Sequence, residues 1–348
     1  MEMSLKLNSF CINLFILIVP FLLINSCGSK ISQRNDSDLK KMGINGNVKY
    51  LKQYAMYAED KFGEIKEIEN SYNDDFVLEF NKLGFLTKKI SYDDSVGDVI
   101  QVEKYIYLNS FNIKYELFSG DESSKNLKYS INNEYDTTRN VLVKRSVYNT
   151  LGYLDNETFF YSNENNNDTL IKYCNSFGKV DSYKRIFYEN DNKNIISEYV
   201  FSGDHKTIHK VNYEHSEQFT VINKMDFINN KSYQSRIYYN KDARVIKEEQ
   251  IFRGVVQITN NYKYDLMGNQ IEISIFNSES LPISRIVRSF ADNSDLVIKE
   301  TVYNIYNKIV SDLELQYKFD DSNNWIKKII YDRVTNSVSV VNREIEYY

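Results

Sequence analysis

The stretch that decides the fold is a ten-residue segment that reads Tyr262-Lys263-Tyr264-Asp265-Leu266-Met267-Gly268-Asn269-Gln270-Ile271. Two aromatic residues stand one residue apart, a turn segment follows, and an aliphatic residue then opens the next alternating stretch. Because Gly268 takes a positive φ at no steric cost and Asp265 can bond the backbone two residues on, the segment predicts a β-hairpin. In that hairpin Lys263 and Glu272 share a face and can pair across the strands.

The same pattern recurs along the chain, with decay. Its aromatic anchors Tyr213, Tyr239, Tyr264 and Phe290 lie 26, 25 and 26 residues apart. In several copies an aliphatic residue comes seven positions after the anchor, as a fixed hairpin register requires; these residues are Leu142, Val180, Ile246, Ile271 and Ile326. The pattern predicts an all-β domain over residues 44–348, an elongated antiparallel β-meander of repeated hairpins that forms a curved or spiralling sheet. At most one short helix is expected, within Asp38–Met42.

The N-terminal residues carry a targeting signal. Residues 1–26 contain Lys6 and then an apolar run from Phe10 to Ile24, which is typical of a signal peptide. The segment Ile24-Asn25-Ser26-Cys27 resembles the lipobox of bacterial lipoproteins. That resemblance implies cleavage before Cys27 and acylation of Cys27 with palmitate-type chains, and residues 27–43 then form the acylated cysteine and a flexible tether. The alternative is an ordinary secretory signal with a chance cysteine.

The lipobox implies a lipid-anchored protein of the outer membrane and the cell envelope. The residues after Cys27, Gly28 to Gln33, contain no acidic cluster, which favours the periplasmic side over the cell surface. Cys11 leaves with the signal peptide and Cys174 remains alone, so no intramolecular disulfide is expected. Cys174 is interpreted as a drifted turn position of the repeat. The net charge of -5, without a basic cluster, excludes nucleic acid as a partner.

Candidate catalytic and metal-binding groups are few. The histidines are His205, His209 and His215, and positions four apart on a strand are about 13 Å apart, too far to share one ion unless a turn intervenes. Paired acids at turns, such as Asp320-Asp321 and Asp93-Asp94, suggest glycoside hydrolysis only if a cleft brings them together. We therefore expect no catalytic residue, no metal site and no cofactor, and we interpret the chain as a protein that is not an enzyme.

Exposed aromatic side chains are the stronger candidates for ligand contact, because the sequence holds 29 Tyr and 20 Phe. The residues singled out are Tyr238, Tyr264, Trp325 and Tyr347, each weighed against simple packing. Such side chains stack on sugar rings or seat a partner strand. The predicted function is a non-enzymatic envelope scaffold or protein-interaction module. Two alternatives stay open, a module that binds glycan or cell wall, and an envelope hydrolase.

The element Tyr-x-Tyr-Asp-x-x-Gly-Asn-x-Ile at Tyr262–Ile271 resembles the tyrosine-aspartate (YD) repeat of the Rhs and teneurin type. With the lipobox, the chain resembles YD-repeat lipoproteins found in Bacteroidota. The resemblance implies antiparallel sheet that spirals, with too few copies here to close a shell around a cargo. It also implies a surface or periplasmic scaffold, with the membrane as partner through Cys27 and an envelope protein or polysaccharide as a further partner.

Overall fold

The structure is a computed structural model that describes residues 37–71, 75–93, 98–189 and 194–348. Its strands form one antiparallel sheet in which consecutive strands pair as hairpins. The strands are β1 (Val48–Lys61), β2 (Glu64–Ser71), β3 (Phe76–Phe80), β4 (Leu86–Tyr92), β5 (Val99–Leu108), β6 (Phe111–Ser119), β7 (Leu127–Asp136), β8 (Val141–Tyr148), β9 (Leu154–Ser162), β10 (Asp168–Asn175), β11 (Val180–Tyr188), β12 (Ile195–Ser202), β13 (Thr207–His215), β14 (Phe219–Asp226), β15 (Lys231–Tyr239), β16 (Val245–Phe252), β17 (Val255–Tyr264), β18 (Gln270–Asn277), β19 (Pro282–Phe290), β20 (Val297–Tyr303), β21 (Ile309–Phe319), β22 (Trp325–Asp332) and β23 (Ser337–Tyr347).

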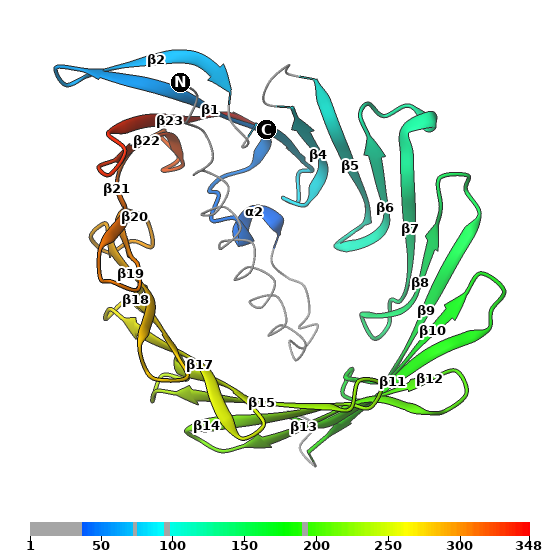
Figure 1. Ribbon diagram of the computed structural model, residues 1–348. Coiled ribbons are helices and arrows are strands. Elements are labelled where there is room, and N and C mark those ends of the chain that lie inside the picture. The colour runs from blue at the N-terminus through cyan, green and yellow to red at the C-terminus, as the bar shows by residue number, and fades with distance from the viewer. Residues whose placement is uncertain (1–36, 72–74, 94–97, 190–193) are drawn as a thin grey trace, which may run out of the picture.

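The sheet closes on itself into a ring (Figure 1). Strand β23 pairs with β1 from Val48 opposite Tyr347 to Ala58 opposite Val338, while the other edge of β1 pairs with β3. Twenty-two strands therefore make a closed antiparallel barrel. Among the described strands, β2 pairs only with the end of β1, and this hairpin lies outside the ring beside β22 and β23 (Figure 1). There Glu67 accepts a hydrogen bond from Lys327 at 2.5 Å.

Closure corrects one part of the expected fold and overturns the family resemblance. The antiparallel meander of hairpins is confirmed, and Lys263 and Glu272 pair across β17 and β18 at 3.0 Å. The resemblance to the YD repeat is wrong, because the strands form a closed barrel and not a spiralling sheet. The quoted motif encodes only a local turn, which any meander can use. Pairing between the first and last strands, 299 residues apart from Val48 to Tyr347, leaves no such local signal.

A recurring turn explains the motif. In the β17–β18 turn, the Asp265 side chain accepts from the Asn269 amide at 2.8 Å, while the Gly268 amide donates to the Asp265 carbonyl at 3.1 Å. Gly268 has a φ of 94°, so the fourth residue of the turn is left-handed. Turns of this kind begin at Asn81, Asn149, Asn163, Asn175, Asn240, Asp265, Asn277, Asn304 and Asp320. They account for the Asx-rich spacing of the sequence.

This turn also corrects the position of Cys174. Asn175 begins the β10–β11 turn, so Cys174 is the last strand residue before it, equivalent to Tyr264 and not to Asp265. It is buried in β10, and burial raises the pKa of its thiol. The bulge between Tyr173 and Cys174 occupies the same place as the bulge between Lys263 and Tyr264, which supports this equivalence. A buried thiol with a raised pKa is unreactive.

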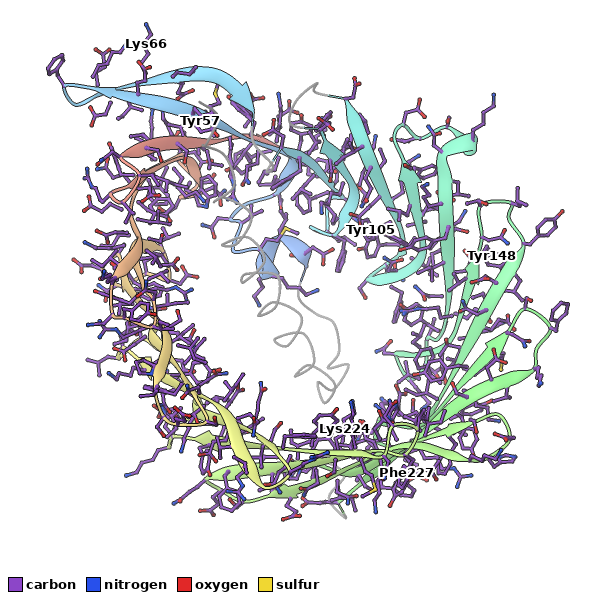
Figure 2. The ribbon with its side chains drawn as sticks, viewed as in Figure 1. Tyr57, Lys66, Tyr105, Tyr148, Lys224 and Phe227 are labelled. Carbon is purple, nitrogen blue, oxygen red and sulfur yellow. The ribbon has the colours of Figure 1, made fainter. Side chains whose placement is uncertain are left out.

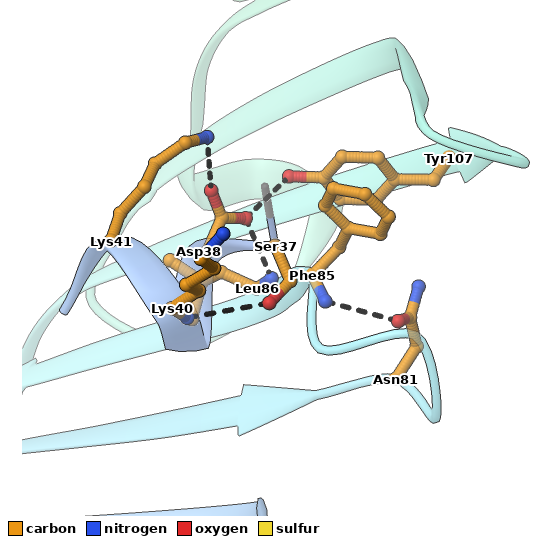
Figure 3. Close-up of polar contacts among 8 residues, drawn as sticks. All are labelled: Ser37, Asp38, Lys40, Lys41, Asn81, Phe85, Leu86 and Tyr107. Carbon is orange, nitrogen blue, oxygen red and sulfur yellow. Dashed lines mark hydrogen bonds and ion pairs between the residues drawn. The ribbon is translucent and has the colours of Figure 1, made fainter. Parts of the chain in front are cut away.

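A four-residue helix, α2 (Asp38–Lys41), lies inside the ring near β3 and β4 (Figure 1). Asp38 accepts hydrogen bonds from the Leu86 amide at 2.9 Å and the Tyr107 hydroxyl at 3.3 Å, and Ser37 caps the helix (Figure 3). Leu39 is buried in a core cluster with Leu51, Leu78, Phe80 and Leu86. The predicted short helix is confirmed, and from Ser37 onward the expected tether is packed against the barrel.

The contact with α2 identifies the two faces of the barrel. Leu51 and Leu78 pack against Leu39 inside the ring, so their face of β1 and β3 is the inner one. Because paired residues in an antiparallel sheet share a face, the register assigns every strand from this starting point. Figure 2 shows Tyr105 and Lys224 on the inner side, and Lys66 on the hairpin outside the ring. Polar and apolar side chains are mixed on the inner face and on the outer face.

Candidate functional site

The inner face carries ionisable groups that lie in separate pairs. Glu103 accepts from the Tyr105 hydroxyl at 2.6 Å and from Tyr115 at 3.2 Å, and burial raises the pKa of both tyrosines. Further around the ring, Lys184 contacts Glu198 at 2.8 Å and Arg288 contacts Glu300 at 2.7 Å. Each pair lies on different strands from the others. Among the described residues, Glu198 Oε1 is buried without a hydrogen-bond partner. The inner face therefore offers scattered charge pairs and no convergent acid–base set within the described residues.

The histidines and the turn acids are equally dispersed. His205 bonds the Tyr183 hydroxyl at 2.8 Å, His209 lies 3.8 Å from Asp226, and His215 bonds the Ile195 carbonyl at 2.8 Å. No group of three metal-ligating side chains occurs in the described part of the chain. Asp320 accepts from the Tyr347 hydroxyl at 2.5 Å and from two turn amides, which is a structural role. Asp94 lies outside the described residues.

On the outer face of β16–β21, lysines are paired with carboxylates. Lys247 contacts Glu249 at 2.6 Å and Lys263 contacts Glu272 at 3.0 Å. Burial is the largest single effect and acts to raise the pKa of both glutamates, but the hydrogen bonds and positive charges around each, led by the lysine, together outweigh it and the net pKa is lowered. We call the outer side chains Lys247, Glu249, Lys263, Glu272, Lys299 and Asp312 the ion-paired face. The charges of its three lysines and three carboxylates largely cancel.

The outer face of β9–β13 has a different composition. We call its side chains the aromatic–cation face: Tyr161, Lys172, Tyr183, Arg185, Phe187, Tyr199, Phe201 and Lys210. The rings pack on one another, with Tyr183 and Phe201 stacked at 4.8 Å and Phe187 edge-on to Tyr199 at 5.7 Å. Phe187 is 44% exposed and Tyr161 is 45% exposed. Aromatic surface of this extent is therefore open to solvent.

The three cations of this face contact rings and not carboxylates. Lys172 lies 5.0 Å from the Tyr161 ring, Arg185 lies 5.8 Å from the Tyr183 ring, and Lys210 lies 5.1 Å from the Tyr199 ring. Across the described residues, none of them has an ion-pair partner within 4.0 Å. A cation over a neutral ring leaves a net positive charge at that place, whereas a cation beside a carboxylate forms a pair with no net charge. This face is consequently positive within a chain of net charge -5.

An amide ladder continues the same outer surface over β13–β15. Asn212, Asn223 and Gln234 lie side by side on consecutive strands, and Gln234 donates to Asn223 at 2.8 Å. They line a shallow groove of about 430 Å³ together with Lys210, Met225 and Phe227. Side-chain amides donate and accept hydrogen bonds at once, as sugar hydroxyls require. The ladder adds polar recognition beside the aromatic surface.

The four aromatic residues expected to contact ligand do not gather in one place. Tyr238 lies on the outer face of β15 and donates to Glu249 at 3.2 Å. Strand β14 separates it from the aromatic–cation face. Tyr264 is on the inner face and donates to the Val245 carbonyl at 2.7 Å. Trp325 packs edge-on to Tyr317 at 6.3 Å. Tyr347 is bonded to Asp320 and Asn324 near the closing seam.

Trp325 also holds an arginine. The Arg343 guanidinium lies 3.4 Å from the centre of the indole ring, and its Nε donates to Gln53 at 3.0 Å. Burial lowers the pKa of Arg343 to about 10, although the nearby Tyr317 acts in the opposite direction. This cluster fixes β22 and β23 to β1. Packing therefore explains Trp325 without a ligand.

The residues of the aromatic–cation face were not among those singled out from the sequence. The available signal was the alternation itself, because Tyr183, Arg185 and Phe187 share one face of a strand, as do Tyr199 and Phe201. What the sequence lacked was the register that sets these strands side by side. Cys27, the predicted acylation site, lies outside the described residues. Among the described helices, none has the length and apolarity to cross a membrane.

No family model and no curated protein matches the sequence. Solved structures with some similarity include a porin-like protein from Bacteroides uniformis, with 10% identity, 87% of this chain and 99% of that chain covered, and a TM-score of 0.27. A porin-like protein from Bacteroides vulgatus has 10% identity and a TM-score of 0.23, with 87% of this chain and 99% of that chain covered. A DUF1329 family protein from Desulfovibrio piger has 9% identity and a TM-score of 0.22, with 89% of this chain and 89% of that chain covered. At these identities and TM-scores the similarities assign no activity to this chain.

Proposed function

We propose that the protein is a non-enzymatic binding module of the cell envelope that holds a polysaccharide on the outer face of its barrel. The observation that carries the proposal is the continuity of the aromatic–cation face with the amide ladder over β9–β15. Sugar rings present apolar faces to aromatic side chains and hydroxyls to amides, and this surface offers both. The dispersed pairs of the inner face support binding without catalysis.

The location in the envelope rests on the lipobox-like segment that ends at Cys27, with the periplasmic side of the outer membrane favoured by the non-acidic residues that follow it. The ion-paired face supports a barrel that stands in water beside the membrane. A lysine or arginine at the midplane of a lipid-facing barrel wall costs about 2–4 kcal/mol, and a carboxylate there costs less but still destabilises the wall. Glu249 stands at the middle of β16 on the outer face, with Lys247 two residues before it and Glu272 on β18. The lipid at Cys27 would then be the attachment.

Binding of polysaccharides to the full-length protein tests this function. We expect saturable binding on a glycan array, confirmed by calorimetry, and a loss of about 2–4 kcal/mol of binding free energy in the Tyr183→Ala/Tyr199→Ala variant, as for central aromatic contacts. Tyr303→Ala is the matched control, because Tyr303 is an outer-face tyrosine that lies under Arg285 at 4.2 Å, away from the site. Absence of saturable binding to every polysaccharide, or an equal loss in the control, would refute the proposal.

A further inference from the structure

The order of side chains across the strands gives the aromatic–cation face a direction. One row of directly paired outer residues runs across six strands, in the order Tyr161, Leu170, Arg185, Tyr199, Lys210 and Met225. Neighbouring strands are about 4.8 Å apart, so the row from Tyr161 to Lys210 spans about 19 Å around the barrel. After Tyr161 and the aliphatic Leu170, the row runs cation, ring, cation from Arg185 to Lys210. A chain-like ligand laid across the strands meets both kinds of side chain in turn.

The rows beside it have complementary content. On one side, Lys172 stands directly opposite Tyr183, and Tyr183 opposite Phe201. On the other side, Asn212, Asn223 and Gln234 form the amide ladder. Lys172, Arg185 and Lys210 therefore lie along the aromatic rows, while the neutral hydrogen-bonding groups lie to one side.

The carboxylates at the border of this face do not pair with its cations. Glu157 is engaged by Lys144 at 2.7 Å, while Asp181 and Glu214 keep their charge and accept hydrogen bonds from asparagine amides at 3.2 Å. Elsewhere on the barrel the common partner of an outer lysine is an acid, as in the ion-paired face. Three cations without an ion-pair partner, set among exposed rings, are complementary to a ligand that brings its own negative charges.

We infer that the polysaccharide is acidic, with anionic groups that contact Lys172, Arg185 and Lys210 while its sugar rings stack on Tyr183 and Tyr199. This inference rests on the proposed function and adds its ligand class. An anionic membrane surface would also attract the three cations. The amide ladder and the length of the row across the curved barrel favour a flexible, hydroxyl-rich chain over a flat lipid surface.

The experiment compares polygalacturonic acid with its fully methyl-esterified form, which keeps the backbone and removes the charge. We expect the full-length protein to bind the acid form at least about tenfold more tightly at low salt, and salt to reduce this preference because it screens exposed charges. Dextran and dextran sulfate form a second pair. Preference for both charged members indicates any anionic sugar chain, and preference for polygalacturonate alone indicates carboxylates; either supports the inference.

The variant is Lys172→Gln/Arg185→Gln/Lys210→Gln. Each basic side chain near an anionic surface contributes about a fivefold change in affinity, so we expect a loss on the order of 100-fold for polygalacturonate and little change for its ester. Arg285→Gln is the control, because Arg285 lies over Tyr303 at 4.2 Å outside the face. Thermal unfolding of each variant establishes that the barrel is intact.

The outcomes separate the two proposals. Equal binding of the acid and its ester, unchanged in the triple variant, would overturn the acidic ligand and leave the polysaccharide function standing. Binding to phosphatidylglycerol vesicles but to no polysaccharide, lost in the triple variant, would overturn both and identify a membrane as the ligand. A loss of the same size in Arg285→Gln would overturn the assignment to this face.

Discussion

The aromatic–cation face and the ion-paired face are built from the same kind of strand, on the same side of one barrel, yet their lysines have different partners. Lys263 contacts a carboxylate at 3.0 Å, whereas Lys210 contacts a ring at 5.1 Å. An exposed ion pair and an exposed cation–π contact each contribute about 0.5–1 kcal/mol, so stability does not distinguish the two designs. The two faces differ in net charge. The cations of the ion-paired face are neutralised by carboxylates, whereas those of the aromatic–cation face have no ion-pair partner among the described residues and can contact an anionic ligand.

Among single substitutions, the largest effect is expected from making one face resemble the other. Arg185→Glu removes a cation and places a carboxylate opposite Tyr199, within reach of Lys172 and Lys210. Affinity for polygalacturonate should fall about 25-fold, with about fivefold for each of the two charge changes. Calorimetry measures the affinity, and thermal unfolding should show the barrel unchanged or slightly stabilised.

The reciprocal change serves as the control. Glu249→Lys leaves Lys247 without its partner and should lower stability without changing polysaccharide affinity. If Glu249→Lys weakened polygalacturonate binding as much as Arg185→Glu, the two faces would not differ in function, and the comparison would fail.

Of the two faces, only the ion-paired face should lose its contribution to the free energy of unfolding in acid. The folded-state pKa values of Glu249 and Glu272 are lowered, because the surrounding hydrogen bonds and positive charges together outweigh the opposing effect of burial, which is the largest single cause. Their contribution is therefore present above the ordinary glutamate pKa of about 4.3 and is lost as pH falls through the lower folded values. We expect the free energy of unfolding in urea to be steady from pH 7 to pH 5 and to fall below about pH 4.

Matched substitutions assign that acid effect. Glu249→Gln/Glu272→Gln should lower stability at pH 7 by about 1 kcal/mol and flatten the fall in acid. Lys172→Gln, on the face without paired acids, should leave the shape of the pH curve intact. A flattened acid limb in Lys172→Gln would show that the aromatic–cation face holds an unrecognised carboxylate partner.

Sequence patterning predicted the elements of this contrast but not their arrangement. Alternation and Asx turns were sufficient for the hairpins, because a turn such as Asp265–Asn269 is made from neighbours in the chain. Closure of the ring was not predictable, since it depends on β1 meeting β23. The aromatic–cation face was missed for the same reason: Lys172, Arg185 and Lys210 lie on three strands, and only the register and the bulges place them together. Trp325 and Tyr264 were chosen for residue type, which does not reveal that both point inward.

The smallest effect is expected in the pairwise couplings. Double-mutant cycles on Lys263/Glu272 and on Lys210/Tyr199, each substituted to alanine, should give coupling free energies below about 1 kcal/mol. The first should shrink in 1 M salt, where the screening length is about 3 Å. Urea unfolding of the four proteins in each cycle provides the values. A coupling of several kcal/mol for Lys210/Tyr199 would mean that this ring and cation stabilise the folded barrel, which would contradict their assignment to ligand binding.

The seam between β1 and β23 has a consequence for how the chain reaches its native state. Strand β1 forms early in synthesis, but its edge from Val48 to Ala58 finds its partner only when the last strand arrives. Until then the molecule is an unfinished band with two exposed borders, open to pairing with other chains. Such distant pairing is slow. The interval between emergence of the first strand and delivery of the last is therefore when this protein is most exposed to misassembly, and when a chaperone has most to protect.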